Sequence, residues 1–213
     1  MAYTKQKINE DFPDTYGLVM CGGSSRRMGT DKSLLQYYDK PQRYHVYDML
    51  LPFCEKVFIS CNELQANNME ADYSFLKDDA AYNNIGPMAA LLTAFDHYPK
   101  KNMLLIGCDY PFLTTTDLQQ FSTNAAAENN AVVFYNEEGK LYEPLLAWYP
   151  YQSFDKIKKM YGTNQFSLQH FLKDNRAFKF YPQNKNSIKS IDTNEEFIKA
   201  RDLIKDPYWI LDT

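Results

Sequence analysis

A glycine-rich, basic stretch near the N-terminus, Cys21–Lys32, combines residue types that bind phosphate groups. It directly follows the apolar run Tyr16–Met20, which is typical of a buried strand. Glycines permit positive φ angles and bring backbone N–H groups close to phosphate oxygens, and basic side chains add positive charge. The stretch contains the adjacent glycines Gly22 and Gly23 and the cations Arg26, Arg27 and Lys32. A surface turn explains either feature alone, but their combination after a buried strand favours a phosphate-binding loop.

The spacing within this loop excludes two common phosphate-binding motifs. A Walker A motif places its lysine immediately after its second glycine, with four residues between the glycines. Here Gly23 and Gly29 enclose five residues, and Lys32 stands three positions beyond Gly29. The dinucleotide fingerprint G-x-G-x-x-G also fails, because Gly22 and Gly23 are adjacent. The loop therefore belongs neither to a Walker-type ATPase nor to a dinucleotide-dependent dehydrogenase.

A carboxylate, Asp109, follows the most apolar run of the chain, Asn102–Gly107. At the carboxyl end of an interior parallel strand, such a side chain lies beside the crevice where ligands bind. Mg²⁺ prefers oxygen ligands and commonly takes one or two carboxylates together with substrate phosphates. Asp109 could instead only start a turn that Pro111 stiffens. Together with the phosphate-binding loop, the pattern favours Asp109 as a magnesium ligand.

The acidic pair Asp78–Asp79 and the following Gly86–Pro87 form a weaker signal. The pair could give a second carboxylate to the metal site or contact a nucleotide sugar. Gly86–Pro87 could begin a helix whose first N–H groups face an anion, although ordinary loop chemistry explains these residues nearly as well. The three histidines lie on predicted helices without metal-ligand spacing, which favours structural or surface roles for His45, His97 and His170.

Short apolar runs alternate with amphipathic runs, as in β-α-β units with a parallel sheet. We predict strands at Tyr16–Met20, Lys56–Cys61, Tyr73–Lys77, Asn102–Gly107, Ala131–Tyr135, Leu141–Tyr149 and Ala177–Tyr181. We predict helices at Arg43–Cys54, Gly86–Tyr98, Thr114–Glu128, Ser153–Tyr161, Ser167–Asp174 and from a capping box at Thr193–Glu196 to about Ile204. Pro144 indicates that its strand is an edge strand or carries a bulge. We expect one domain over residues 1–213, with an open, mostly parallel sheet and with residues 1–15 as a flexible or peripheral extension.

Composition narrows the choice of function further. The chain has 213 residues and a formal net charge of -4, which argues against binding to nucleic acid. Cys21, Cys54, Cys61 and Cys108 include no C-x-x-C pair, so a zinc site or a disulfide framework is not expected. No run approaches ~20 apolar residues, and residues 1–14 have no apolar signal core. We therefore expect a cytoplasmic enzyme without membrane contact.

The segment Gly17–Leu34, GLVMCGGSSRRMGTDKSL, resembles the signature of the molybdenum cofactor guanylyltransferases, roughly L-x-G-G-x-S-x-R-M-G-x-D-K. Later segments resemble this family in the same order, so that the resemblance extends from about Tyr16 to Ile204. These are Asp78 with Gly86-Pro87-Met88-Ala89, the C-D-x-P sequence Cys108–Pro111, Glu143–Ala147, and Ser190–Glu196. The resemblance implies a Rossmann-like three-layer α/β/α nucleotidyltransferase fold with a mostly parallel sheet.

The resemblance also implies a reaction. GMP would pass from GTP to the terminal phosphate of molybdopterin or Mo-molybdopterin, with release of pyrophosphate, and Mg²⁺ would be the cofactor. The implied catalytic residues are Lys32, Arg27 and Asp109, with Asp109 as the metal ligand. The implied nucleotide-binding residues are Cys21, Gly22, Gly23, Ser25, Lys32, Asn62, Asp78, Gly86 and Asp109. The implied acceptor-binding residues are Pro144, Ser190 and Asp192. Molybdoenzymes or other proteins of molybdenum cofactor synthesis are the implied protein partners.

Four residues depart from the family pattern. Ala90 replaces a glycine and would put a Cβ beside a nucleotide contact. Ser190 and Asp192 replace two asparagines, and Asn194 replaces a proline. A carboxylate at position 192 is unfavourable near an anionic acceptor unless a cation or hydrogen-bond donor compensates for its charge. Two alternatives therefore stay open: a related transferase with another acceptor or nucleotide (of the cytidylyl or sugar-phosphate type), and a nucleotide-binding protein without turnover.

Overall fold

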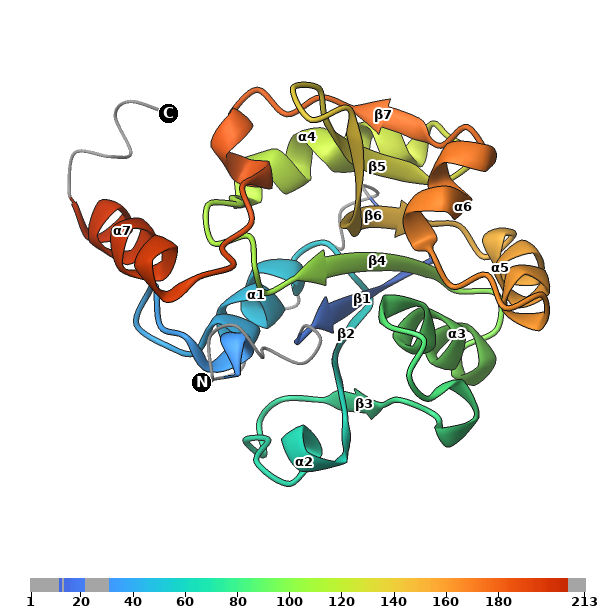
Figure 1. The fold of residues 1–213 in the computed structure, drawn as a ribbon, viewed down its shortest axis with the longest axis horizontal. Coiled ribbons are helices and arrows are strands. Elements are labelled where there is room, and N and C mark those ends of the chain that lie inside the picture. The colour runs from blue at the N-terminus through green and yellow to red at the C-terminus, as the bar shows by residue number, and fades with distance from the viewer. Residues whose placement is uncertain (1–11, 13, 22–30, 207–213) are drawn as a thin grey trace.

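The computed structural model describes Phe12, residues 14–21 and residues 31–206. These residues form a seven-stranded sheet in the order β3-β2-β1-β4-β6-β5-β7 (Figure 1). Its strands are β1 (Thr15–Met20), β2 (Lys56–Cys61), β3 (Phe75–Lys77), β4 (Asn102–Gly107), β5 (Val132–Asn136), β6 (Leu141–Tyr149) and β7 (Phe178–Phe180). Only β6 runs antiparallel to its two neighbours, and the other neighbouring pairs are parallel. The predicted mostly parallel sheet is confirmed.

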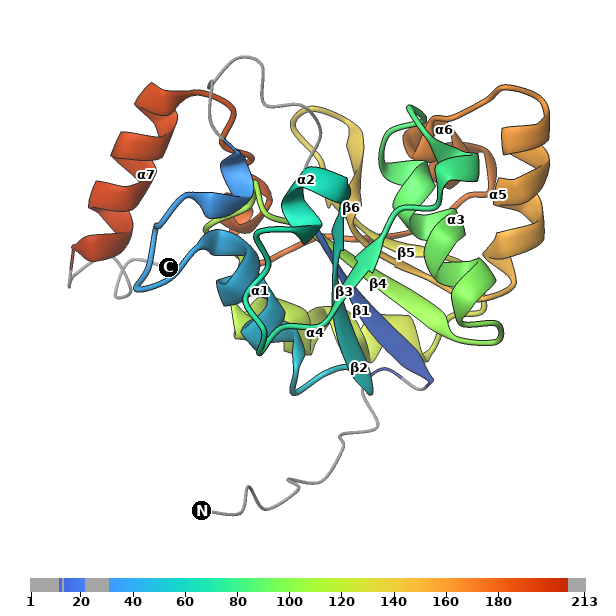
Figure 2. The same ribbon diagram turned by 90° about the horizontal axis from the view of Figure 1, so that it is seen from below.

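Helices cover both faces of this sheet. They are α1 (Gln42–Leu50), α2 (Glu63–Ala66), α3 (Pro87–His97), α4 (Thr115–Ala126), α5 (Ser153–Gly162), α6 (Leu168–Asp174) and α7 (Asn194–Lys205). Short 3₁₀ turns add η1 (Lys32–Leu34), η2 (Ala80–Tyr82) and η3 (Lys185–Ile188). Helices α1 and α4 lie on one face, whereas α3, α5 and α6 lie on the other (Figure 2). The predicted three-layer α/β/α arrangement is therefore confirmed.

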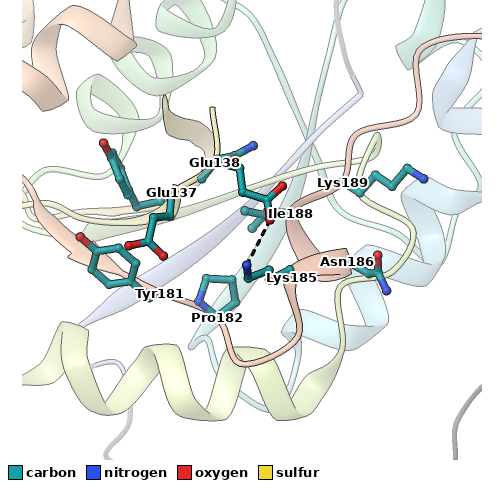
Figure 3. Close-up of a pocket in the computed structure, with 10 residues that line it drawn as sticks. Glu137, Glu138, Tyr181, Pro182, Lys185, Asn186, Ile188 and Lys189 are labelled. Atoms are coloured by element: carbon teal, nitrogen blue, oxygen red, sulfur yellow. Dashed lines mark hydrogen bonds and ion pairs between the residues drawn. The ribbon is translucent and has the colours of Figure 1, made fainter. Parts of the chain in front are cut away.

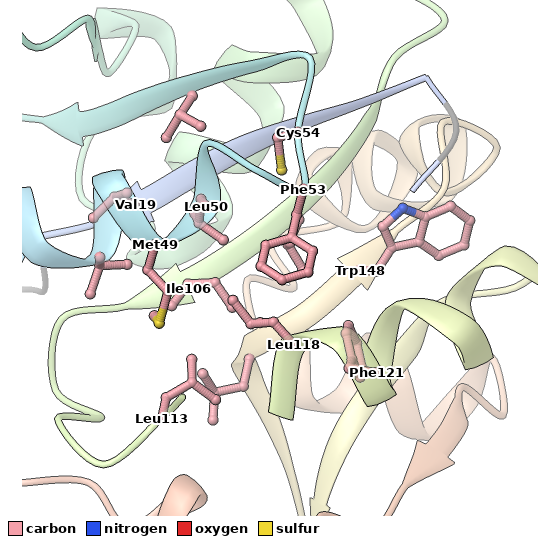
Figure 4. Close-up of a cluster of buried hydrophobic side chains, with 14 of the residues drawn as sticks. Val19, Met49, Leu50, Phe53, Cys54, Ile106, Leu113, Leu118, Phe121 and Trp148 are labelled. Atoms are coloured by element: carbon pink, nitrogen blue, oxygen red, sulfur yellow. The ribbon is translucent and has the colours of Figure 1, made fainter. Parts of the chain in front are cut away.

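The two cores follow from the alternation of side chains along the strands. Leu104 and Ile106 of β4 face α1 and α4, and Met103 and Leu105 face the opposite helices. Figure 4 shows the first core, to which Leu50 of α1, Phe121 of α4 and Trp148 of β6 contribute. Because β4 is buried by helices on both faces, it needs the uninterrupted apolar run that its sequence has.

Strand β6 corrects one expectation. It lies inside the sheet, between β4 and β5, so its prediction as an edge strand is wrong. The alternative, a bulge, is confirmed: the register with β5 shifts between Val133 and Tyr135. Pro144 lies in the part of β6 opposite this irregularity and beyond Leu146, which is the last residue paired with β4. A proline lacks the N–H group of a regular ladder, and the irregular pairing accommodates it.

The last helix, α7, begins where its capping box predicts. The Thr193 side chain accepts from the Glu196 backbone, and the Glu196 carboxylate accepts from the Thr193 backbone N–H at 2.9 Å. A separate small core holds the helix against the segment that follows η1. Its buried members are Tyr37, Phe112, Ile191 and Ala200. The C-terminal helix is thereby fixed next to residues that follow the phosphate-binding loop in sequence.

The N-terminal boundary also needs a correction. The Phe12 side chain is 4% exposed and packs near Phe53 and Phe121, and Thr15 begins β1. The predicted extension over residues 1–15 is therefore wrong for Phe12 and Thr15, which belong to the core and the sheet. The four cysteines are buried and free. Within the residues that the structure describes, no helix has the length and apolar character to cross a membrane.

Candidate active site

Four of the predicted site residues follow the carboxyl ends of four neighbouring strands. Cys21 follows β1, Asn62 follows β2, Asp78 follows β3, and Asp109 stands two positions after β4. These strands are parallel to one another, so their carboxyl ends meet at one edge of the sheet. The edge is the ligand crevice that the sequence predicts.

A cleft of about 910 Å³ opens at this edge, beyond β1, β2 and β3. We call it the β1–β3 cleft. Four predicted nucleotide-binding residues line it: Cys21, Asn62, Asp78 and Gly86. The volume lies in the range of small-ligand sites in proteins. The predicted loop residues Gly22, Gly23, Ser25 and Arg27 lie outside the described residues.

Asp78 presents a partly buried carboxylate to the β1–β3 cleft. Its Oδ1 accepts a hydrogen bond of 2.9 Å from the Ser60 hydroxyl. Burial raises the pKa of Asp78, and the Ser60 hydrogen bond opposes that rise. Asp78 follows β3, which lies three strand spacings from β4, or roughly 14 Å. This separation favours a role for Asp78 at the nucleoside over a metal site shared with Asp109.

Asn62 contributes to the cleft through a short helix that sequence periodicity missed. Its side chain caps α2 by accepting from the Gln65 N–H at 3.0 Å, and the Gln65 side chain accepts from the Asn62 N–H at 3.1 Å. The Gln65 amide nitrogen also donates to Asp31 Oδ2 at 2.9 Å. Because Asp31 immediately precedes Lys32, this capping box fixes the end of the phosphate-binding loop. The N-x-x-Q spacing was the signal that could have identified the helix.

Gly86 confirms the predicted helix start. It precedes α3 with φ +65° and ψ −147°, a conformation that favours glycine, and Pro87 occupies the first turn. The expectation that the Ala90 Cβ lies beside the nucleotide is wrong. Ala90 of α3 faces the core and is fully buried, and Ala89 lines the cleft instead. Consecutive side chains of a helix point about 100° apart, so Ala89 faces the cleft while Ala90 faces the sheet, and the motif alone does not distinguish the two.

Asp109 has the perturbed electrostatics of a functional carboxylate. Burial raises its pKa to about 6, while the nearby Lys32 lowers that pKa and Asp192 raises it. The backbone of Gly107 lies directly beneath the carboxylate, where an added Cβ would collide with Asp109 Oδ1. The most apolar strand thus ends in a glycine because the acidic side chain turns back over it.

Lys32, at the other end of the loop, lowers the pKa of Asp109 through its charge and contacts the C-terminal segment directly. Its Nζ donates to Asp192 Oδ1 at 2.6 Å and to the Ile191 carbonyl at 3.0 Å. The Ile191 N–H donates to the Asp109 carbonyl at 2.8 Å. Lys32 therefore supplies the cation that the sequence requires beside Asp192. We call Asp109, Lys32 and Asp192 the central cluster.

The predicted acceptor residues come from β6 and from the segment between η3 and α7. Pro144 and Ser190 are both partly buried, on β6 and just after η3. Glu143, next to Pro144, accepts a hydrogen bond of 3.0 Å from the Tyr110 hydroxyl. Glu143 belongs to the Glu143–Ala147 motif, for which only Pro144 was predicted to have a role. The contact shows that it braces the residue that follows Asp109.

A second cavity, of about 450 Å³, lies at the same edge beyond β5 and β7 (Figure 3). We call it the β5–β7 cavity. The rings of Tyr135 and Tyr181 stand edge to face with their centroids 5.6 Å apart. Lys185 Nζ pairs with Glu138 Oε1 at 3.1 Å, and Lys189 is a further cation in the lining. None of these residues was predicted. No sequence motif groups them, and only the fold brings them together at the sheet edge.

The strand order determines how the β1–β3 cleft, the central cluster and the β5–β7 cavity are arranged along the sheet edge. Strand β4 is the middle strand, with β1, β2 and β3 on one side and β6, β5 and β7 on the other. The central cluster at its carboxyl end therefore stands between the two openings.

No group of three or more His, Cys, Asp or Glu side chains suited to a metal occurs among the described residues. A single carboxylate such as Asp109 still fits Mg²⁺, because that ion takes its remaining ligands from phosphates and water.

The fold and this site define a nucleotide-binding protein of the open α/β class, with ligand openings at the carboxyl ends of parallel strands. A comparison with family models identifies its branch. The chain belongs to the family of MobA-like NTP transferase domains, whose model matches residues 17–178. The resemblance seen in the loop motif and the predicted nucleotidyltransferase class are thus confirmed.

Individual relatives agree with this assignment. The chain is 34% identical over 134 residues to a molybdenum cofactor biosynthesis bifunctional protein of Synechocystis, a match that covers 63% of this chain and 38% of that protein. It is 26% identical over 182 residues to the molybdenum cofactor guanylyltransferase of Shewanella sediminis, with 84% and 91% of the two chains covered.

A solved structure shares the fold. It is the molybdopterin-guanine dinucleotide biosynthesis protein A of Archaeoglobus fulgidus, with a TM-score of 0.73 at 20% identity and with 89% of this chain and 98% of that chain covered. The predicted Rossmann-like three-layer fold is confirmed.

Proposed function

We propose that this protein transfers GMP from GTP to the terminal phosphate of molybdopterin or Mo-molybdopterin and releases pyrophosphate. The product is the molybdopterin guanine dinucleotide cofactor. One observation carries the proposal: the central cluster stands between two separate openings at one sheet edge. A group-transfer enzyme needs a donor site and an acceptor site that meet at the reacting atoms.

The β1–β3 cleft is the donor site in this proposal. The loop Cys21–Lys32 holds the triphosphate, and Asn62, Asp78 and Gly86 contact the nucleoside. A carboxylate such as Asp78 accepts hydrogen bonds from the N–H groups of guanine or from sugar hydroxyls. Its anchoring by Ser60 supports this role, because a fixed acceptor loses less freedom on binding.

Asp109 would hold Mg²⁺, which would supply positive charge to the triphosphate when bound. The carboxylate must lose its proton for this role, and the nearby Lys32 favours the ionised form. Lys32 and Arg27 contribute charge to the phosphates from the protein itself. These residues act by positioning and by stabilising charge that develops on the pyrophosphate leaving group.

The β5–β7 cavity forms the acceptor site in this proposal, together with Pro144, Ser190 and Asp192. Tyrosine rings suit a flat heteroaromatic ring, and Lys185 and Lys189 suit an anionic group. An acceptor phosphate oxygen then forms a bond to the α-phosphorus of GTP, and the bond from that phosphorus to the β-phosphate bridging oxygen breaks. The attacking oxygen already carries charge, so the reaction needs no general base. We expect the protein to act in the cytoplasm, with molybdenum cofactor synthesis proteins or molybdoenzymes as partners.

The decisive experiment measures pyrophosphate release from GTP in the presence of Mg²⁺ and molybdopterin, with the dinucleotide product identified by mass spectrometry. We expect release with GTP and not with CTP. Release with CTP, or only with a sugar-phosphate acceptor, would support the related transferase. GTP binding without release from any acceptor would support a nucleotide-binding protein without turnover.

A further inference from the structure

We propose that Asp192 is a positioning residue for Lys32, holding the lysine ammonium group beside Asp109, between the donor and acceptor openings. The inference rests on the proposed function, since it gives a role to a residue of the same site. It assigns Asp192 an action on the lysine, whereas sequence comparison suggested contact with the acceptor.

The segment that carries Asp192 is itself fixed at two backbone positions. The Ile191 N–H donates to the Asp109 carbonyl at 2.8 Å, which ties the segment to the end of β4. The Asp192 N–H donates to Glu196 Oε2 at 2.9 Å, which ties it to the capping box of α7. Two consecutive residues are therefore immobilised from opposite sides. The oxygens that they present have defined positions relative to Asp109.

Those oxygens bind one ammonium group. Lys32 Nζ donates to Asp192 Oδ1 and to the Ile191 carbonyl, at 2.6 and 3.0 Å. The Lys32 side chain is 15% exposed and that of Asp192 is 52% exposed, so the contact lies at the mouth of the site. A lysine has a long flexible stem, and two anchored acceptors restrict the directions that its ammonium group samples. Without them the group loses its fixed position next to Asp109.

The contact also balances charge where the phosphates meet. Asp109 and Asp192 place two carboxylates near one another, and Asp192 raises the pKa of Asp109 while Lys32 lowers it. The ion pair with Lys32 neutralises the charge of the Asp192 carboxylate. An anionic acceptor therefore does not face an uncompensated negative charge at this position. Because the pair joins η1 to the segment before α7, it also connects the donor loop to the acceptor segment.

Two substitutions separate the hydrogen-bond acceptor from its charge. Asp192→Ala removes the oxygen that Lys32 contacts, whereas Asp192→Asn retains an oxygen in the same place. We expect Asp192→Ala to lower kcat at least tenfold and to change the KM for GTP less than threefold. We expect Asp192→Asn to retain at least one third of kcat and not to weaken acceptor binding. A matched control is Glu195→Gln, which breaks the nearby exposed Lys199–Glu195 pair and should leave kcat unchanged.

A double-mutant cycle tests whether Asp192 acts through the lysine. Lys32→Ala is expected to abolish most turnover with the fold intact. Adding Asp192→Ala to Lys32→Ala should then lower kcat by less than a further twofold. An undiminished tenfold effect in the double variant, or full activity of Asp192→Ala alone, would overturn the proposal.

A measurement without turnover keeps this inference separate from the proposed function. NMR relaxation of the Lys32 Nζ and Cε groups reports their mobility in the unliganded protein. We expect greater mobility in Asp192→Ala than in the wild type and near wild-type mobility in Asp192→Asn. Equal mobility in all three proteins would refute the positioning role. Absent pyrophosphate release from the wild type would refute only the proposed reaction.

Discussion

The Tyr110 hydroxyl donates a hydrogen bond of 3.0 Å to the Glu143 carboxylate and thereby joins the end of β4 to β6. Burial raises the pKa of Glu143, and the bond from Tyr110 lowers it. The hydrogen bond therefore lies between Asp109, one residue before Tyr110, and Pro144, one residue after Glu143. It connects the backbone next to Asp109 with the backbone next to Pro144.

Removing this hydrogen bond should cost stability in a pH-dependent way. A carboxyl group whose pKa is higher in the folded than in the unfolded protein favours folding only while it is protonated. Its contribution to stability is fully present below the pKa of the unfolded protein and is lost as the pH rises through the pKa of the folded protein. Tyr110→Phe leaves the Glu143 pKa higher still, so its cost grows with pH. We expect a loss of about 1–2 kcal/mol at pH 8 and a smaller loss at pH 4, measured by urea unfolding. Tyr110→Phe in a Glu143→Gln background should show no such pH dependence.

Replacing Asp109 should separate stability from function. The folded pKa of about 6 lies above the ordinary value of 3.8, so ionised Asp109 opposes folding at neutral pH and protonated Asp109 does not. Asp109→Asn should therefore raise the free energy of unfolding at pH 8 by about 3 kcal/mol, with little effect at pH 3.5. Turnover should be almost abolished. The exposed Asp72→Asn is the control, and equal stability of Asp109→Asn and wild type at pH 8 would contradict the stated cause.

Gly107 offers a test of how closely Asp109 must be placed. A Cβ at this position would collide with Asp109 Oδ1 and approach Tyr110 Cε2 and Leu145 Cβ at 3.1 and 3.2 Å. Gly107→Ala should displace the carboxylate and lower kcat at least tenfold, because small misplacements of catalytic groups cost large factors in rate. Gly162→Ala is the matched control, since a Cβ there meets no atom within 4 Å. Similar rates in both variants would show that the carboxylate tolerates displacement.

Asp78 and its neighbour provide a comparison for nucleotide binding. Asp78 lines the β1–β3 cleft, whereas Asp79 caps η2 and lies outside the lining. We expect GTP to raise the melting temperature of the wild type more than CTP does, because a ligand stabilises the state that it binds. Asp78→Asn should weaken GTP affinity at least tenfold, as the loss of a hydrogen bond to a charged group predicts. Asp79→Asn should bind GTP as the wild type does; equal affinities in both variants would exclude Asp78 from the nucleoside site.

Local patterns determined the elements and their order. The alternating apolar runs predicted all seven strands of the sheet, and β2, β4 and β6 have the predicted bounds. The capping box at Thr193 located the start of α7, because a cap uses only atoms a few residues apart. The four-residue helix α2 was missed, since periodicity cannot register so short a helix.

The sequence by itself determined that a glycine-rich, basic segment follows a buried strand, that a carboxylate follows the most apolar strand, and that the chain is a nucleotidyltransferase. Each of these depends on residues close together in the chain. Only the tertiary structure decided that Lys32 binds Asp192, 160 positions away, and that three strand spacings separate β3, which Asp78 follows, from β4, which Asp109 follows. It also placed β6 inside the sheet. The reason is physical: strand order and helix docking arise from burying apolar faces against one another, and that burial brings together residues whose separation in sequence carries no record of their contact.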